Sequence, residues 1–509
     1  MKKRVVLLAL VLICILSTIP AIAIAEAPKR GGVLTYATGT DALTLDPQFI
    51  KDVPTSRVIQ HMHETLVARD INMTFIPGLA VSWSVSEDNL TWTFKLRKGV
   101  TFHDGAPFNA EAVKFTFERI KDPEIGSPRK SMVRMFKEIE VIDDYTVAFT
   151  TKNLFAPFLA QISSKYLAIL SPLSAGKWGK KYTDHPAGTG PFKLESRVPG
   201  EKIVLVRNDN YWGQKPYLDK LVFKVVPEDS SRVMLLMSGE ADVIASVPPV
   251  MLPKLKKTKG THVMKKTGFR TIFIGLNNRV KPFDNLLVRR AVAHAIDTGA
   301  IHKGILGGIG TLGGGWESVV ISGAHQGLKP RAYDPEKAKI LLAEAGYPNG
   351  FETTFYTPTG RYLMDRQVAE AVQAQLKEVG ITAKIRTPDF GTLIAILDKG
   401  TEAPMFLMGK GSPSGDLDLT MKLSIKTGGK FNQFQYANPK VDAMIVRQAQ
   451  IVDQAERYRV LKEIQEIIYD EIPCVVLFYE DQLFGKRAKV HGVEVYPDEF
   501  ISFMRAWKK

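Results

Sequence analysis

Alternating polar and hydrophobic residues predict short β-strands in this chain. Residues 91–96, TWTFKL, alternate with the two-residue period of a half-buried strand. A Lys-Gly pair at 98–99 lets the chain turn, and residues 100–102 start a second strand that ends at the Asp-Gly turn of 104–105. The block therefore predicts two short strands and a turn, and none of its residues indicates chemical activity.

Other segments show similar strand patterns. Tyr145, Val147 and Phe149 alternate after an Asp-Asp turn, and two hydrophobic strands flank a loop around residues 211–212. The two flanking strands are residues 203–206 and 221–226. The remaining strands are predicted at residues 33–36, 271–276 and 355–357.

Helices are indicated by hydrophobic residues spaced three or four apart and by residues typical of helix ends. Asn109 is a plausible N-cap for a helix that places Val113 and Phe117 on one face. Because strands and helices alternate along the chain, the predicted class is mixed α/β. Further helices are predicted at residues 56–67, about 285–306, 334–346, 364–379 and 453–471.

The first residues have the pattern of a cleaved signal peptide. Basic residues at 2–4 precede a hydrophobic stretch at 5–19, and an A-x-A site ends at Ala25. An uncleaved membrane anchor is the weaker interpretation, because the hydrophobic stretch is short and Pro20 ends it. We therefore expect a soluble periplasmic protein that is cleaved after Ala25.

Charge and cysteine content restrict the possible partners and disulfide bonds of the protein. The segment 1–25 carries three positive charges and no negative ones, so its removal lowers the formal charge from +15 to +12. The basic residues are scattered and the chain is predicted to be exported, which argues against nucleic acid as a partner. Contact with anionic lipid headgroups and preference for an anionic ligand are the two alternatives that the positive charge leaves. Cys474 would be the only cysteine left, so no intramolecular disulfide is expected.

Four motifs invite an enzymatic or metal-binding interpretation, and the sequence favours a structural one for each. Residues 308–313 match G-x-G-x-x-G, but a predicted helix precedes them where a strand is required. His61 and His63 point to different faces of a helix, and His103 cannot readily face its neighbour Asp104. Residues 411–415 read GSPSG, so neither serine occupies the central position that the G-x-S-x-G motif of a nucleophile elbow requires. We expect no catalytic residue, no metal and no cofactor.

Several longer motifs occur in a characteristic order along the chain. They resemble the dipeptide-, oligopeptide- and nickel-binding proteins that feed bacterial ABC importers, which form family 5 of the extracellular solute-binding proteins. The motifs are PGLAVSWSVSEDNLTWTFKLRKGVTFHDGAPF at 77–108, GTGPF at 188–192, RNDNYWGQKPYLDKLVFKVV at 207–226, SGEADV at 238–243, NNRVKPFDNLLVRRAVAHAID at 277–297, YDPEKAKILLAEAGYPNGF at 333–351 and EIP at 471–473.

The resemblance implies the class II periplasmic-binding-protein fold. In that fold two α/β lobes are joined by a hinge, and this family inserts an extra domain in the N-terminal lobe. The implied divisions are lobe one at roughly 30–75, 185–270 and 480–509, the inserted domain at 76–184 and lobe two at 271–479.

The same resemblance implies a function in transport. Short peptides or peptide-like solutes would be captured by hinge closure and delivered to permease subunits in the inner membrane, by a protein that is itself monomeric. Glutathione, nickel chelates, opines and oligosaccharides are the alternative ligands. An exported enzyme or a folding helper on the same fold is the alternative of a different class.

Loops at the faces of the two lobes supply the candidate ligand-binding residues. Family members line the cleft with the loop that corresponds to Thr38, Gly39, Thr40 and Asp41. Asp41 would accept a ligand ammonium group or cap a turn, and the sequence does not separate these roles.

The second candidate loop is residues 406–418, with Lys410, Ser412 and Asp416 as predicted contacts. Peptide-binding relatives have a tryptophan where this chain has Lys410, and an aspartate near the position of Pro413. The usual ammonium salt bridge is therefore in doubt, which should change the ligand class or its pose.

Four further residues complete the candidate list. Arg361 could clamp a carboxylate or lie in solvent, and Tyr362 follows it in the same loop. Arg270 lies near the expected hinge. Trp316 would stack on ligand or pack within its own lobe.

Overall fold

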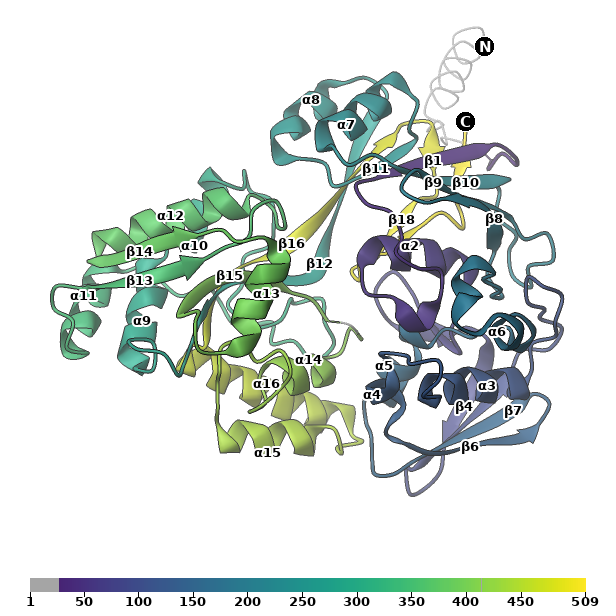
Figure 1. The fold of residues 1–509 in the computed structure, drawn as a ribbon, viewed down its shortest axis with the longest axis horizontal. Coiled ribbons are helices and arrows are strands. Elements are labelled where there is room, and N and C mark those ends of the chain that lie inside the picture. The colour runs from purple at the N-terminus through teal and green to yellow at the C-terminus, as the bar shows by residue number, and fades with distance from the viewer. Residues whose placement is uncertain (1–26, 413) are drawn as a thin grey trace, which may run out of the picture.

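A mixed β-sheet extends through the whole molecule. The computed structural model describes residues 27–412 and 414–509, so the predicted signal peptide lies outside the described residues. Within these ranges ten strands form one continuous sheet (Figure 1). In sheet order they are β14 (Ile381–Arg386), β13 (Phe351–Tyr356), β15 (Met405–Lys410), β12 (Thr261–Leu276), β16 (Cys474–Arg487), β11 (Val243–Ala245), β1 (Val33–Thr38), β10 (Lys220–Val225), β9 (Lys202–Arg207) and β8 (Phe192–Val198).

Two long antiparallel strands, β12 and β16, connect the two halves of this sheet. Their pairing is continuous except for register shifts, one of which falls between Thr267 and Thr271. We call the half built on β1 and β8–β11 the first lobe and the half built on β13–β15 the second lobe. The register shift lies where the chain passes from one lobe to the other, so the second lobe is attached through two adjacent strands (Figure 1).

Helices cover both faces of the sheet in the first lobe. Leu34 and Tyr36 of β1 pack in a core with Val58 on one face, whereas Ala37 packs with Leu236 on the other. This opposite placement follows from the two-residue period of a strand. The covering helices are α2 (Val53–Met62), α7 (Asp229–Ser238) and α8 (Leu252–Lys257).

The second lobe contains most of the longer helices. Their hydrophobic faces share one large core with β12, β13, β15 and β16. These helices are α9 (Leu286–Ala295), α10 (Thr298–Gly304), α11 (Pro335–Glu344), α12 (Asp365–Glu378), α13 (Phe390–Lys399), α14 (Leu417–Ser424), α15 (Pro439–Gln448) and α16 (Gln454–Glu471).

A separate antiparallel sheet lies below the first lobe in Figure 1, next to α14–α16. Its strands are ordered β4-β5-β7-β6 and enclose a core of their own, in which Phe94, Phe117, Phe149 and Phe158 are fully buried. Its elements are β4 (Ala80–Val85), β5 (Thr91–Leu96), β6 (Phe136–Asp143), β7 (Thr146–Thr151), α3 (Ala110–Lys121), α4 (Lys130–Val133) and α5 (Phe158–Ile162).

The remaining elements are short. No helix of residues 27–412 and 414–509 has the length and apolar character needed to cross a bilayer. The short elements are α6 (Pro172–Trp178), β2 (Val67–Arg69), β3 (Phe75–Pro77), β17 (Val490–His491), β18 (Glu494–Val495), β19 (Ile501–Ser502), β20 (Trp507–Lys508), and the 3₁₀ turns η1 (Pro47–Phe49), η2 (Lys165–Leu167), η3 (Gly179–Asp184) and η4 (Pro249–Met251).

The mixed α/β prediction is confirmed, with local corrections. Residues 100–102 form no strand: Thr101 makes only an isolated bridge to Pro107, and β5 pairs with β4 and β7 instead. The helix predicted over about 285–306 is two helices, because the chain leaves helical geometry at Ile296 and Asp297 caps α10.

Candidate ligand-binding site

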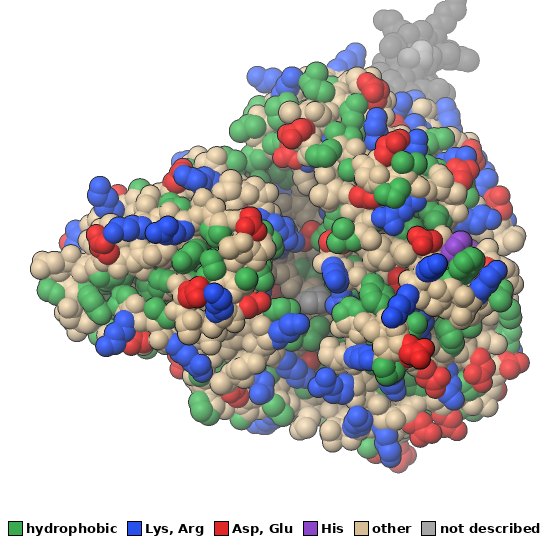
Figure 2. Space-filling model, viewed as in Figure 1, with side chains coloured by type: hydrophobic (Ala, Val, Ile, Leu, Met, Phe, Trp, Pro, Cys, Tyr) green, Lys and Arg blue, Asp and Glu red, His purple; other side chains and the backbone are tan. Residues whose placement is uncertain are grey.

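A cavity of about 560 Å³ lies between the first lobe, the four-stranded body and the second lobe. Figure 2 shows the surface hollowed between the lobes. The second lobe contributes Ser414 and Gly415, and Phe269 lies at the crossing strand. The polar and aromatic lining residues are Gln60, His63, Glu64, Thr65, Arg69, Asp70, Ser163, Ser164, Lys165, Tyr211, Trp212, Glu494, Tyr496, Asp498, Phe500, Ser502 and Arg505.

Glu64 organises one wall of the cavity. Its carboxylate accepts hydrogen bonds from the Tyr211 hydroxyl at 2.8 Å, the Trp212 indole at 2.9 Å and the Thr189 hydroxyl at 2.8 Å. Burial raises the pKa of Glu64, and these three donors act in the opposite direction. The carboxylate therefore fixes the Tyr-Trp loop against the cavity and is itself occupied by protein donors.

Arg69 forms the corner at which the two lobes meet. Its Nε donates to the Ser163 hydroxyl at 3.0 Å, and its Nη2 donates to the backbone carbonyl of Ser414 in the second lobe at 2.6 Å. The guanidinium lies over the Phe75 ring, and burial lowers its pKa. Among the described residues Nη1 is buried without a hydrogen-bond partner. One cationic side chain thus bridges the cleft.

Charges of both signs line the rest of the cavity. Lys165 lies 3.4 Å from the Asp498 carboxylate, and although burial opposes its charge, Asp498 holds its pKa above the ordinary value. Glu494 and Arg505 also line the space. A lining with carboxylates and cations around aromatic rings suits a ligand that carries both charges.

The lobes also touch at the far rim of the cleft, away from the connecting strands. The backbone N–H of Ala156, in the four-stranded body, donates to the Ala449 carbonyl of the second lobe at 2.7 Å. Lys422 of α14 lies 5.4 Å from the centre of the Phe155 ring. Together with Arg69, these contacts connect the second lobe to the opposite side of the cleft.

Of the predicted site residues, the loop at 38–41 does not line this cavity. Thr38 ends β1 and pairs with Val225, and Gly39 packs against the Arg232 guanidinium. Asp41 accepts hydrogen bonds from the backbone N–H groups of Ala42 and Gly200. Thr38, Thr40 and Asp41 adjoin only a void of about 10 Å³. Asp41 therefore holds a turn in this structure.

The second predicted loop reaches the cavity only through Ser414 and Gly415. Lys410 donates to the Phe431 carbonyl at 2.9 Å, and the Ser412 hydroxyl donates to the Asp416 carbonyl. The Asp416 carboxylate is buried and makes a bidentate pair with Arg457, with N–O distances of 2.6 and 2.9 Å.

The other candidates are also engaged within the protein. Arg270 pairs with Glu480 at 2.7 Å and Glu499 at 2.9 Å, at the crossing between the lobes. Trp316 is buried against Phe273 and Phe434, which is the packing role that the sequence left open.

The two neighbours Arg361 and Tyr362 lie outside the cavity lining. The Tyr362 hydroxyl donates to the Gly409 carbonyl at 3.2 Å. Arg361 is exposed and lies over the Tyr362 and Phe390 rings. The cavity residues Glu64, Arg69, Lys165 and Asp498 were not among the sequence candidates, because single charged residues between short strands carry no spacing that marks a site.

His61 and the glycine-rich loop make contacts within the protein, whereas His63 also lines the cavity. His61 is fully buried, with Nδ1 2.7 Å from the Arg57 carbonyl and Nε2 accepting from the Phe503 backbone N–H. In residues 27–412 and 414–509 no cluster of potential metal ligands occurs. The glycine-rich loop pairs through Thr311 with Tyr479 of β16.

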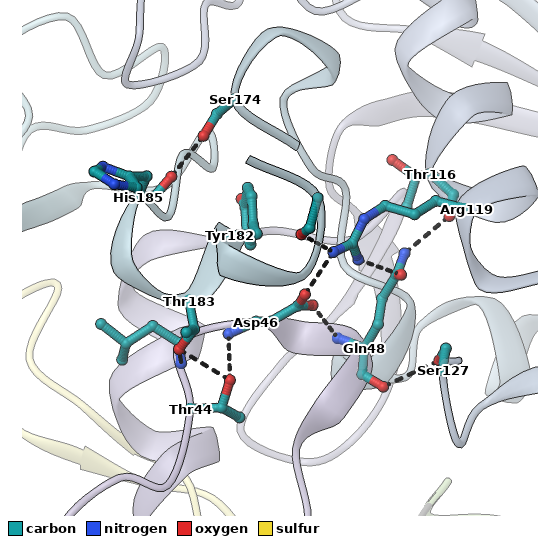
Figure 3. Close-up of polar contacts among 12 residues, drawn as sticks. Thr44, Asp46, Gln48, Thr116, Arg119, Ser127, Ser174, Tyr182, Thr183 and His185 are labelled. Atoms are coloured by element: carbon teal, nitrogen blue, oxygen red, sulfur yellow. Dashed lines mark hydrogen bonds and ion pairs between the residues drawn. The ribbon is translucent and has the colours of Figure 1, made fainter. Parts of the chain in front are cut away.

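A buried polar network joins the first lobe to α3 of the four-stranded body (Figure 3). Arg119 of α3 pairs with Asp46 at 2.8 Å and donates to the Gln48 side chain at 2.6 Å. Gln48 in turn donates to the Thr116 carbonyl, and Ser127 donates to the Gln48 carbonyl. Because Asp46 and Arg119 are buried and paired, this network anchors α3 to η1.

Comparison with known proteins connects this geometry to a family. Residues 74–432 match the model for bacterial extracellular solute-binding proteins, family 5 Middle. The glutathione-binding protein GsiB of Escherichia coli (strain K12) is 32% identical over 479 residues, which cover 92% of this chain and 93% of that protein.

Solved structures agree in fold. The periplasmic binding protein DppA from Helicobacter pylori, in complex with the peptide STSA, is 32% identical with a TM-score of 0.80, over 94% of this chain and 98% of that one. The dipeptide-binding protein from Pseudoalteromonas sp. SM9913, in complex with Met-Leu, is 25% identical with a TM-score of 0.81, over 94% and 100%. The periplasmic-binding-protein fold predicted from the sequence is confirmed, and the chain belongs to family 5 of the bacterial extracellular solute-binding proteins.

Proposed function

We propose that this protein is the substrate-binding component of an ABC importer for short peptides or peptide-like solutes. The observation that carries the proposal is the cavity between two lobes that are joined through two adjacent strands. Ligand that contacts both lobes favours the closed arrangement by its differential affinity for that state. The cavity volume of about 560 Å³ falls in the range typical of small-molecule sites.

Glutathione is the second candidate ligand. The relatives that are 32% identical over 92% of this chain are named glutathione-binding proteins. Glutathione, like a short peptide, carries an ammonium group and carboxylates, which the mixed charges of the cavity suit. Nickel chelates, opines and oligosaccharides remain alternatives of the same transport class.

The transport role also implies a location, a membrane partner, an oligomeric state and a division into domains. We propose export to the periplasm with cleavage after Ala25, delivery to permease subunits in the inner membrane, and a monomeric state. We also propose the division into lobe one, an inserted domain at 76–184 and lobe two. The separate sheet and core between β4 and β7 support that inserted domain.

The direct test is native mass spectrometry of the mature protein purified without refolding, followed by thermal-shift assays with dipeptides, tripeptides and glutathione. We expect a retained small ligand or a melting temperature that rises with ligand concentration, as mass action requires. A protein whose melting temperature none of these compounds raises, but which converts one of them to a product, would be an exported enzyme. Binding of unfolded chains without selectivity among small ligands would indicate a folding helper. Either outcome refutes the transport proposal.

A further inference from the structure

A short basic segment on the first lobe has a composition that ligand capture does not require. Residues 250–260, VMLPKLKKTKG, contain four lysines and no acidic residue. The segment runs from η4 through α8 to the start of β12. We call the surface formed by Val250, Lys254, Lys256, Lys257 and Lys259 the α8 patch.

The α8 patch is exposed, and its four lysines make no ion pair within residues 27–412 and 414–509. On the adjacent α7, Asp229 pairs with Arg232, while Glu228 and Glu240 form no ion pair with the lysines of the patch. The lysines of the patch are therefore not held in ion pairs and can contact an external anionic surface.

Hydrophobic side chains accompany the lysines. Val250 is 72% exposed at the tip of the segment, and Met234 of the adjacent α7 is 54% exposed. Figure 2 shows basic, acidic and hydrophobic side chains mixed on the surface over α7 and α8. An apolar tip beside unpaired cations is the arrangement by which peripheral proteins bind the interface of an anionic bilayer.

The patch is held rigidly to the protein. Leu255 is fully buried, and it packs in a cluster with Val233 and Leu236 of α7. The same cluster contains Ile309 from the second lobe, so α8 lies at the junction of the two lobes. Because α8 is already folded and packed against α7, its lysines can contact a membrane surface without a folding step.

We propose that the α8 patch binds membrane surfaces rich in anionic phospholipid. Lysines are point charges that suit a diffuse layer of headgroup phosphates better than a pocket, and the patch has neither the arginines nor the aromatic rings of a nucleic-acid surface. Adsorption would concentrate the protein near the bilayer independently of its ligand.

The test is co-sedimentation of the full mature protein with vesicles of phosphatidylcholine alone or mixed with phosphatidylglycerol. We expect binding only to the mixed vesicles and its loss at high salt. Replacing Lys254, Lys256 and Lys257 together by glutamine should weaken binding roughly a hundredfold, since each lysine contributes about fivefold. Val250→Ser should weaken it further at all salt concentrations.

The matched control replaces three other exposed lysines that are dispersed along the chain, Lys121, Lys137 and Lys152, by glutamine. This control should keep its vesicle binding, and all variants should keep the wild-type melting temperature. Equal loss in both triple variants would mean that binding follows total charge, and would overturn the proposal. So would equal binding to both vesicle types, or binding only to vesicles that carry the reconstituted importer. Solute binding is measured in solution without vesicles. A protein that binds no solute would therefore refute the proposed function without affecting the vesicle result.

Discussion

At the scale of single residues, Gly415 permits the closest approach of the two lobes. Its φ of +64° lies in the left-handed region, and a Cβ at this position would lie 2.6 Å from Arg69 Nη1 and 3.0 Å from the Phe269 ring. A glycine is required because both the backbone conformation and the available space exclude a side chain.

We therefore expect Gly415→Ala to shift the protein toward open conformations. The methyl group would push the second-lobe loop away from Arg69 and weaken the hydrogen bond from Arg69 to the Ser414 carbonyl. Small-angle scattering of the ligand-free protein should show a larger radius of gyration. Gly411→Ala is the matched control, because a Cβ there meets nothing within 4 Å and the backbone is not left-handed. An unchanged radius in Gly415→Ala would contradict the expectation.

His61 makes the stability of the first lobe depend on pH. Burial lowers the pKa of His61 from its ordinary value of 6.5 to about 4. The unfolded chain therefore binds a proton more readily, so the contribution of neutral His61 is complete above pH 6.5 and is lost as the pH falls toward 4. Protonation would also remove the acceptor of the Phe503 N–H.

The measurement is urea unfolding of the wild type and His61→Gln across this pH range. The stability difference between them should be largest above pH 6.5 and should shrink by on the order of 3 kcal/mol by pH 4. Groups common to both proteins cancel in the difference. A difference that does not vary with pH would show that folding does not change the pKa of His61.

The candidate ligand-binding residues show why single residues were hard to assign from sequence. Asp41 and Asp416 have the chemistry to bind an ammonium group, but backbone N–H groups hold the first and Arg457 holds the second. Such partners lie far along the chain and leave no local pattern. Arg69 was missed for the converse reason, because its importance comes from the Ser414 carbonyl across the cleft.

At the scale of elements, three helix N-caps were predictable, whereas strand pairing and other helix ends were not. The helix predicted at 56–67 ends at Met62, before β2 begins at Val67. Asn109, Asp334 and Asp453 cap α3, α11 and α16 as expected, because a cap depends on residues three positions away. Residues 100–102 failed as a strand because β5 finds its partners in β4 and β7, and local alternation cannot show which neighbour a strand will choose.

Asp416 has a structural role that joins two helices. It accepts from the Asp418 N–H at the start of α14 and pairs with Arg457 of α16. We expect Asp416→Asn to lower the free energy of unfolding by roughly 3–5 kcal/mol, since it leaves a buried guanidinium uncompensated. The double variant with Arg457→Gln should cost less than the sum of the single changes.

The same variant tests the ligand-binding alternative for Asp416. Isothermal titration with the ligand identified by mass spectrometry should give an unchanged affinity, because the carboxylate is directed at Arg457. Lost affinity with unchanged stability would instead restore Asp416 to the binding site.

At the scale of the whole molecule, closure brings the four-stranded body against the second lobe. Ala156 and Ala449 meet through a 2.7 Å backbone hydrogen bond at the rim of the cleft. We expect the pair Ala156→Cys and Ala449→Cys to form a disulfide that appears faster when ligand is present, because ligand favours the closed arrangement. Nonreducing electrophoresis measures the rate, and each single variant is the control. A rate independent of every bound ligand would contradict closure by ligand.

The two-lobed fold was predictable only through the resemblance carried by the long motifs. Periodicity indicated mixed α/β structure, but it could not show that β12 and β16 extend through both lobes. Residues 271–276 were expected as a short strand, whereas β12 runs from Thr261 to Leu276 because it pairs with β16 on both sides of the register shift.

The two-strand attachment also bears on the order in which the protein is made. The second lobe is one uninterrupted stretch of chain, whereas the first lobe is built from stretches on both sides of it. Ile501 and Phe503 pack in the core with Leu34 and Val58. During synthesis the second lobe can therefore be completed while the first still lacks part of its core. A translocation machinery that accepts unfolded chains would thus have nearly the whole period of synthesis in which to engage this protein before its first lobe can fold.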